Sequence, residues 1–293
     1  MSSTICFHHN DEDGRASGAI VRYALGDDVQ LFETDYDGKE IPWEAVLKAS
    51  LVIVVDFSFP KQDMQTMAAG RNFIWIDHHK SALTELEDVS RKWHGTRDLN
   101  NAACVLTWKY FFPSRPVPRA ITLIGDRDTW RWVEADTGAF TEGLYVRDTR
   151  AENDTLWPLL FEENPTLMVE ITTEGQRLRE IRLGEVEEQI KRGGFEVIFE
   201  GHRTLVINAH GNGDLGQRGR DLGFEIIYCY IDQMQQDVLT TVVTLFSRQA
   251  DVSAIARQYG GGGHANAAGF SFTRTSTPFP ANAVVQWLRE KPI

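Results

Sequence analysis

Acidic and imidazole side chains gather in a few short stretches of this 293-residue chain. In three of the stretches an apolar run ends and metal-competent residues follow at once. They are His9, Asp11 and Asp13 in FHHNDEDG, Asp56 in VVDFS, and Asp77, His78 and His79 in IDHH. Any one of them could be a solvated loop residue, but the repetition favours a shared site. Carboxylates and imidazoles without thiolates suit Mn²⁺, Mg²⁺ or Fe²⁺ better than structural zinc.

The number of carboxylates indicates more than one metal ion. A fourth stretch, IGDRD (124–128), adds Asp126 and Asp128. Asp11, Asp13, Asp56 and Asp126 would bring four negative charges into one cleft, which two divalent cations would neutralise. Two such ions can stabilise the attacking and leaving oxygens of a phosphoryl displacement. The sequence therefore predicts a phosphate site that depends on metal.

The elements that must position these residues alternate in an α/β manner. Strands are predicted at residues 4–8, 29–34, 51–58 and 73–77, and helices at 16–25, 41–50, 61–70, 101–112 and 117–128. Short, fully apolar strands such as LVIVV are typical of a parallel sheet covered on both faces. Ligands of such sheets bind at the carboxyl ends of the strands, where the acids and histidines fall.

A change of character after residue 194 predicts a second domain. Residues 1–165 form the predicted catalytic domain, 166–194 a linker helix, and 195–293 a smaller, β-rich domain of mixed α/β structure. The smaller domain ends in a predicted short helix around Ala283–Arg289.

The glycine run of YGGGGHANAAGF (259–270) is a second candidate site. Consecutive glycines let backbone amides approach an anion closely, and a helix starting after them would point its positive dipole at that anion. A flexible hinge is the alternative for glycines alone. His264 directly after the run favours substrate binding, with Gly261, Gly262 and Gly263.

Composition limits the partners. The formal net charge of −12, from 30 basic and 42 acidic residues, excludes the basic stripe expected of a duplex-DNA binder. No signal peptide or membrane span is predicted. Three scattered cysteines favour a reducing compartment, so a cytoplasmic protein is expected. The oligomeric state stays open, a dimer included.

The motifs HNDEDG, VDFS, DHH and GGGGHANAAGF, in this order, resemble the DHH/DHHA1 phosphoesterase family, which includes the RecJ exonucleases and the nanoRNase/pAp phosphatases. The resemblance covers essentially the whole chain. It implies an N-terminal parallel-sheet DHH domain joined by a helix to a DHHA1 domain, and two Mn²⁺ ions, with Mg²⁺ or other divalent ions as substitutes.

The resemblance also implies roles for individual residues. One ion would be held by His9, Asp11 and Asp56, and the other by Asp13, Asp56, His78 and Asp126. Asp77 would orient a histidine and His79 would lie nearest the scissile phosphate, so these two are the predicted catalytic residues. Asp128 would lie outside the ligand set, and His8 remains a rival to His9.

The second domain departs from the family at one position. Relatives carry an arginine in SLRS, whereas TLFS (244–247) has Phe246 there and Arg248 two residues later. Arg248 is the candidate replacement, and Gly261, Gly262, Gly263 and His264 complete the predicted substrate-binding set.

The expected activity is Mn-dependent hydrolysis of short single-stranded RNA or DNA, or of linear dinucleotides, to mononucleotides. The polarity, 3′–5′ or 5′–3′, stays open. A soluble cyclic-dinucleotide or pAp phosphohydrolase is the alternative enzyme. A catalytically silent nucleotide-binding regulatory module is the alternative of another class.

Overall fold

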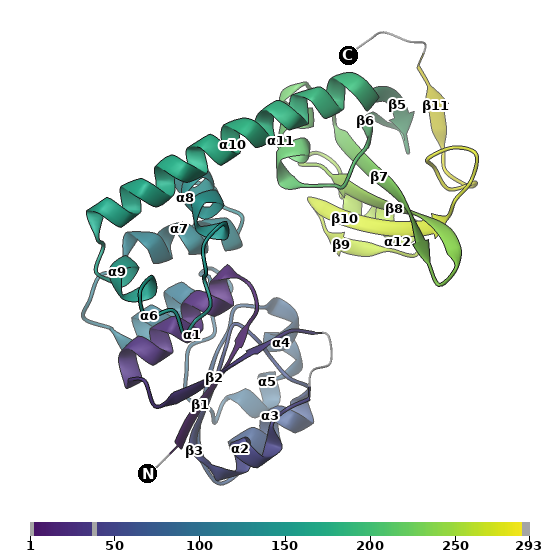
Figure 1. Cartoon of the computed structure of the whole chain (residues 1–293). Helices are drawn as coiled ribbons and strands as arrows, with labels where there is room; N and C mark the ends of the chain where they lie inside the picture. The colour runs from purple at the N-terminus through teal and green to yellow at the C-terminus, as the bar shows by residue number, and fades with distance from the viewer. Residues whose placement is uncertain (1–2, 37–39, 289–293) are drawn as a thin grey trace. The chain divides into compact units, whose positions relative to one another are not determined.

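The computed structural model describes residues 3–36 and 40–288, and the chain divides into two compact units (Figure 1). Unit 1 is Met1–Arg179 and unit 2 is Glu180–Ile293. Helix α10 (Pro165–Gly193) contains the boundary, so its first half packs with unit 1. One continuous helix thus crosses the boundary between the two units.

Unit 1 is built on a parallel four-stranded sheet in the order β2-β1-β3-β4. Its strands are β1 (Ser3–His9), β2 (Val29–Thr34), β3 (Ala49–Val55) and β4 (Asn72–Ile76). Each was predicted from its apolar run. Because all four run in one direction, their carboxyl ends lie at one edge of the sheet.

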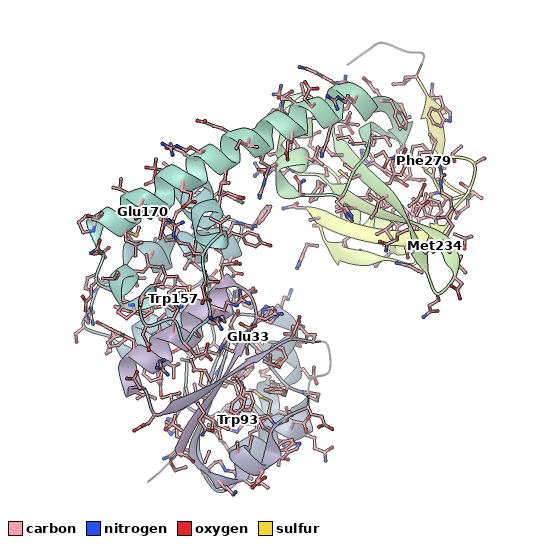
Figure 2. All side chains as sticks on the ribbon, in the orientation of Figure 1. Glu33, Trp93, Trp157, Glu170, Met234 and Phe279 are labelled. Atoms are coloured by element: carbon pink, nitrogen blue, oxygen red, sulfur yellow. The ribbon has the colours of Figure 1, made fainter. Side chains whose placement is uncertain are left out.

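Helices cover both faces of this sheet. They are α1 (Glu12–Leu25), α2 (Trp43–Lys48), α3 (Lys61–Ala68), α4 (Lys80–Glu85), α5 (Glu87–Ser90), α6 (Ala103–Phe111), α7 (Arg119–Asp128), α8 (Thr137–Tyr145) and α9 (Trp157–Phe161). Buried Trp157 belongs to a core formed largely by helices, and partly buried Trp93 packs on a core beside the sheet (Figure 2). Apolar strands between two helical layers confirm the predicted α/β class.

Unit 2 contains a mixed seven-stranded sheet in the order β11-β5-β6-β7-β8-β10-β9. Its strands are β5 (Phe195–Phe199), β6 (His202–Asn208), β7 (Ile226–Gln235), β8 (Val238–Phe246), β9 (Gly262–His264), β10 (Ala267–Thr273) and β11 (Val285–Trp287). Helices α11 (Gly213–Asp221) and α12 (Val252–Gln258) complete it. Phe279 lies in its core (Figure 2).

The predicted terminal helix around Ala283–Arg289 is wrong within the described residues, and Arg289 lies outside them. Strand β11 forms there instead, with Val285 opposite Phe199 of β5. The Trp287 ring stacks on Phe195 with centroids 5.6 Å apart. An open sheet edge and β-favouring side chains thus outweigh the weak helical pattern.

No helix among the described residues is long and apolar enough to cross a membrane.

Candidate metal centre

The carboxyl ends of three adjacent strands bring the predicted metal-competent residues together. Strand β1 ends at His9, Asp56 follows β3, and Asp77 follows β4. Because β3 lies between β1 and β4, Asp56 occupies the centre of the site. The site thus lies at the predicted edge of the sheet.

The first group consists of His9, Asp11 and Asp56, whose ligand atoms lie within 4.8 Å of one another. His9 Nδ1 is 2.8 Å from Asp11 Oδ2 and 3.9 Å from Asp56 Oδ2. Asp11 also caps helix α1, since its Oδ1 accepts a hydrogen bond from Gly14 N at 2.9 Å. A side chain at position 14 would overlap the His9 backbone, so glycine is required for this close approach.

The second group consists of Asp13, His78 and Asp128. His78 Nε2 lies 3.7 Å from Asp13 Oδ2 and 3.4 Å from Asp128 Oδ2. Asp13 is buried in the first turn of α1 and accepts hydrogen bonds from Ala103 N and Cys104 N at the start of α6. These amides hold the carboxylate against the end of β4.

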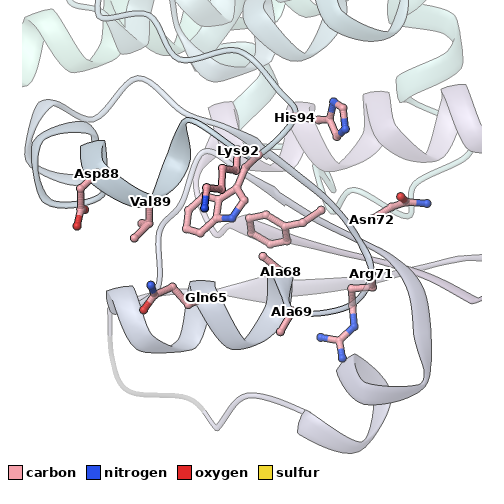
Figure 3. Close-up of a pocket in the computed structure, with 11 residues that line it drawn as sticks. Gln65, Ala68, Ala69, Arg71, Asn72, Asp88, Val89, Lys92 and His94 are labelled. Atoms are coloured by element: carbon pink, nitrogen blue, oxygen red, sulfur yellow. The ribbon is translucent and has the colours of Figure 1, made fainter.

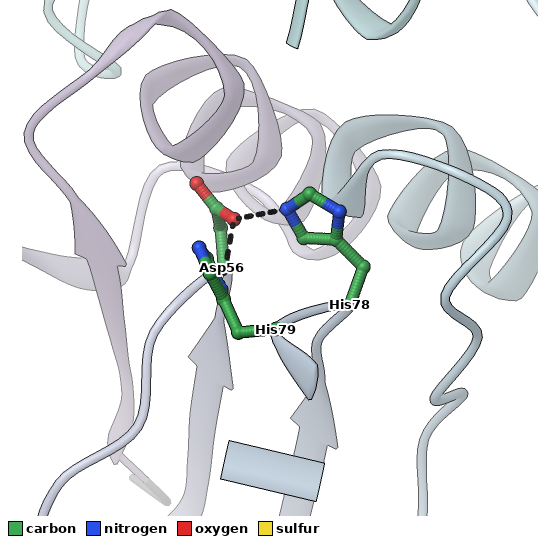
Figure 4. A group of neighbouring side chains, drawn as sticks. All are labelled: Asp56, His78 and His79. Carbon is green, nitrogen blue, oxygen red and sulfur yellow. Dashed lines mark ion pairs between the residues drawn. The ribbon is translucent and has the colours of Figure 1, made fainter. Parts of the chain in front are cut away.

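Asp56 belongs to the first group and also to a third group, which it forms with His78 and His79. Its Oδ2 lies toward His9, whereas its Oδ1 is 3.4 Å from His78 Nε2 and 3.9 Å from His79 Nδ1 (Figure 4). Asp56 is 1% exposed, and neither oxygen has a hydrogen-bond partner among the described residues. Its φ of 53° is uncommon for a residue other than glycine, and such strain is concentrated at functional sites.

Asp77 positions the DHH segment. Its buried Oδ1 accepts hydrogen bonds from His78 N at 2.7 Å and His79 N at 3.1 Å. The same oxygen lies 2.8 Å from His79 Nδ1. This contact fixes the His79 ring and leaves Nε2 available to a ligand, and His79 is partly exposed. The geometry therefore suits Asp77 as an orienting residue and His79 as a phosphate contact.

Asp126 was predicted as a metal ligand, but the structure places it outside all three groups. Its carboxylate accepts hydrogen bonds from Val133 N at 3.0 Å, Glu134 N at 3.2 Å and Thr137 Oγ1 at 2.5 Å. Burial raises the pKa of Asp126, but these hydrogen bonds lower it further, so the pKa lies below its usual value. Asp126 thus fixes the turn after α7, and Asp128, two residues on, takes the predicted position beside His78.

Two further residues clarify the site. His8, the rival of His9, is fully buried beside Gly18 of α1 and lies in none of the three groups. Asp35 follows β2, the edge strand beside β1, and its Oδ1 is 3.7 Å from His9 Nε2. Asp35 was not predicted as a site residue, although it follows a predicted strand in the same way as Asp56.

The pKa values of the buried aspartates indicate whether these residues fit metal ions. Burial, followed by repulsion from Asp13 and Asp11, raises the pKa of Asp56 well above its usual value and that of Asp128 to about 8. Burial raises the pKa of Asp13 as well. Buried carboxylates that repel each other need cations to stabilise their ionised forms, and the oxygens of Asp56 also lack hydrogen-bond partners in the described chain. The donor set is therefore that of a metal site, and hard divalent ions fit its oxygen and nitrogen donors.

The glycine motif differs from its prediction. No helix follows the glycines within the described chain, and Gly262–His264 instead forms strand β9, paired with β10. A side chain at Gly261 would lie 2.0 Å from Gly269 O, so close approach of the two strands requires glycine there. His264 is exposed at the end of β9, available to a ligand. Arg248 is also exposed and lies beyond the end of β8.

The pocket in Figure 3 is separate from these groups. It has a volume of about 450 Å³ and is lined by residues of α3, by the start of β4 and by the segment around Lys92. Strand β4 begins at Asn72, so this pocket lies at the opposite edge of the sheet from His78. Arg71 there donates to the carbonyls of Thr66 and Met67, which gives it a structural role.

Two known proteins have similar sequences. No family model matches the chain. It is 29% identical over 232 residues to uncharacterized protein R106 of Acanthamoeba polyphaga mimivirus, covering 76% of this chain and about half (53%) of that protein. It is 23% identical over 299 residues to oligoribonuclease NrnB of Bacillus subtilis strain 168, covering 91% and 72%.

Solved structures define the class of the fold. The DHH domain of a member of a family of ribosomal proteins has a TM-score of 0.59 and 16% identity, covering 92% of this chain and 82% of that one. The pGpG-specific phosphodiesterase PggH of Vibrio cholerae has a TM-score of 0.54 and 14% identity, covering 93% and 94%. The chain has the DHH fold, which confirms the resemblance seen in its motifs.

The acids at positions 126 and 128 provide a matched pair of variants. We expect Asp128→Asn to lower the amount of bound divalent metal, because a carboxylate leaves the second group. Asp126→Asn should retain the metal but lose about 1–3 kcal/mol of stability, since it accepts fewer hydrogen bonds. Metal analysis and thermal unfolding of both variants measure this. Metal loss in Asp126→Asn alone would restore the original assignment.

Metal should stabilise the protein more at higher pH. Without metal, the raised pKa values of Asp13, Asp56 and Asp128 mean that the folded state binds more protons than the unfolded state. Its stability therefore falls as the pH rises from about 4 toward 8. The pKa of Asp11, lowered to about 2, adds no change in this range. The rise in Tm on replacing EDTA with Mn²⁺ should be larger at pH 8 than at pH 6, and an equal rise would contradict the electrostatic account.

Proposed function

We propose that this protein is a metal-dependent phosphodiesterase that hydrolyses short single-stranded oligonucleotides or linear dinucleotides to mononucleotides, with two Mn²⁺ ions as cofactor. The observation that carries the proposal is the position of Asp56. Its two buried oxygens face different groups of ligands, as expected of a carboxylate shared by two ions. Three buried, unpaired cysteines support a reducing compartment such as the cytoplasm.

We assign separate roles to the metal ligands, to His79 and to His264. We assign one ion to His9, Asp11 and Asp56, and the other to Asp13, Asp56, His78 and Asp128. When bound, such ions stabilise charge on phosphoryl oxygens and activate water. His79, held by Asp77, would donate a hydrogen bond to the phosphate, and the exposed His264 would hold a part of the substrate away from the scissile bond.

The relatives favour a short nucleic-acid substrate. NrnB is named an oligoribonuclease and PggH a pGpG-specific phosphodiesterase. The abbreviation pGpG denotes a linear dinucleotide of guanosine. Linear dinucleotides therefore rank above cyclic dinucleotides and pAp in our proposal.

One assay tests the proposal. The purified protein is incubated with Mn²⁺ and di- to decanucleotides of RNA and DNA, cyclic dinucleotides and pAp, and products are separated by chromatography. We expect mononucleotides from linear dinucleotides and short oligomers. Hydrolysis of only cyclic dinucleotides or pAp would establish the alternative enzyme. Failure to cleave any of these, or bis-p-nitrophenyl phosphate, would indicate a silent nucleotide-binding module.

His264→Ala should separate substrate capture from chemistry. Binding energy from a distant part of the substrate is used to orient the scissile bond. We therefore expect kcat/KM for dinucleotides to fall about 10- to 100-fold, with little change for bis-p-nitrophenyl phosphate, which has no distal nucleotide. Bound Mn²⁺ should stay at the wild-type level. Equal losses for both substrates would place His264 in the chemical step or in folding.

A further inference from the structure

Two tryptophans without a role in the metal centre follow helix α7. Asp128 of the second group is the last residue of that helix, and Trp130 and Trp132 come directly after it. Two peptide units separate Trp130 from Asp128, so their Cα atoms lie at most about 7.6 Å apart. Trp130 is 44% exposed, whereas Trp132 is partly buried. A large aromatic ring that solvent can reach is thus attached beside the metal centre.

The backbone at both tryptophans is strained. The φ angle is 57° at Trp130 and 55° at Trp132, values that favour glycine and are rare for a bulky residue. Asp126 maintains this conformation, because its carbonyl accepts a hydrogen bond from Arg131 N at 3.0 Å and its Oδ1 accepts one from Val133 N at 3.0 Å. Strained residues that the surrounding structure maintains in this way are concentrated at ligand-binding sites. The chain therefore keeps a large ring at a position where the backbone alone would favour glycine.

Neighbouring side chains hold the two rings. The Arg127 guanidinium lies over both, 5.1 Å from the Trp130 centroid and 5.5 Å from the Trp132 centroid. The rings meet edge to face, with centroids 5.3 Å apart and planes at 84°. Arg179 of α10 adds a second guanidinium over Trp132, at 6.0 Å. Trp132 is thus the enclosed member of the pair, and Trp130 is the member with ring surface left for a ligand.

Internal packing accounts for Trp132 but leaves the exposure of Trp130 unexplained. A tryptophan that serves only packing buries most of its surface, as the fully buried Trp75 and Trp108 do. Trp130 instead remains open to solvent, while its contact with Arg127 fixes the orientation of the ring. A ring that is already fixed loses little freedom when a planar ligand stacks on it, which favours binding.

We propose that Trp130 stacks on the base of the nucleotide whose phosphate lies at the metal centre, and so acts as a substrate-binding residue. A base is joined to its own phosphate through one ribose, so a phosphate at the metal centre places that base near a ring two residues from Asp128. The choice of a nucleobase rests on the proposed function, whereas the exposed and strained ring rests on the structure alone. Every base has a π face, so the site should accept all of them, with a preference for the larger rings of purines.

Binding can be measured without turnover, because a mononucleotide contains no phosphodiester. Full-length protein with Mn²⁺ is titrated by calorimetry with AMP and with ribose 5-phosphate, which has the same sugar and phosphate but no base. We expect AMP to bind at least about tenfold more tightly. Trp130→Gly, which suits the φ of 57°, should remove most of that difference, and Trp130→Phe should retain most of it. AMP should also quench the fluorescence of the wild type and of Trp287→Phe, a control at an exposed tryptophan of unit 2, but have much less effect on Trp130→Phe.

Equal affinities for AMP and ribose 5-phosphate in the wild type would overturn the stacking site, as would a Trp130→Gly variant that keeps the full difference. An equal loss of affinity for both ligands in Trp130→Gly would also overturn it, because the residue would then support the metal centre and not the base. A wild-type protein that binds AMP as expected but hydrolyses no phosphodiester would contradict the proposed function and leave the stacking site intact, so the two failures are distinguishable.

Discussion

Asp56→Asn should reduce phosphodiesterase kcat at least about 1,000-fold, the largest effect expected of any single substitution in this protein. Both oxygens of Asp56 face ligand groups, so its replacement weakens both proposed metal positions at once. We expect the bound Mn²⁺ measured by metal analysis to fall from two ions per chain to one or none. Asparagine is the appropriate replacement because it tolerates the positive φ of 53° at this position.

The stability of the same variant separates metal loss from misfolding. Asp56 is buried and its pKa is raised by burial and by neighbouring acids, so its ionised form destabilises the metal-free protein. Metal-free Asp56→Asn should therefore unfold at or above the wild-type Tm at pH 8. Asp237→Asn is the matched control, since Asp237 also has positive φ, at 64°, but lies in the β7–β8 turn. Full activity in Asp56→Asn would overturn the shared-ligand assignment.

The position of the site at one edge of the sheet could be predicted from the sequence, because it depends on where each apolar strand ends. Apolar runs define β1, β3 and β4, and parallel strands place their carboxyl ends together. The residues that follow each run, from His9 to His79, then had to meet. The choice of His9 over His8 follows from side-chain direction, since alternate residues of a strand face opposite sides, but this needs the exact strand register.

The sequence pattern could not predict which of Asp126 and Asp128 faces the metal site. Both follow the apolar part of α7, and two residues along a helix differ by about 200° in direction. Which carboxylate faces His78 depends on how α7 rotates about its axis as it packs against α6 and α8. That rotation is set by tertiary contacts, such as the hydrogen bond from Thr137 to Asp126, which the sequence does not display.

The helix considered after the glycine run is absent from the described chain for a different reason. Glycine runs before a helix and glycine runs within a close strand pair have the same composition. In this chain Gly261 and Gly263 are needed because β9 approaches β10 closely. The distinction rests on pairing between segments, and pairing partners cannot be read from one segment.

His79→Asn should lower kcat for dinucleotides about 100- to 1,000-fold while leaving the bound Mn²⁺ unchanged. Its Nδ1 lies 2.8 Å from Asp77 Oδ1 and 3.9 Å from Asp56 Oδ1, so that nitrogen is already engaged by Asp77. The remaining nitrogen is the one that can reach a substrate phosphate. KM should change less than kcat, because the hydrogen bond strengthens as charge develops on the phosphoryl oxygens.

His78→Asn is the matched substitution one residue away. His78 Nε2 is buried, has no hydrogen-bond partner among the described residues and lies 3.4 Å from oxygens of both Asp56 and Asp128. Its loss should therefore remove Mn²⁺ as well as activity, and raising the Mn²⁺ concentration should restore part of kcat. Excess Mn²⁺ should not restore His79→Asn. If both variants lose metal equally, His79 belongs to the ligand set, since its Nδ1 would then have to leave Asp77 for the ion.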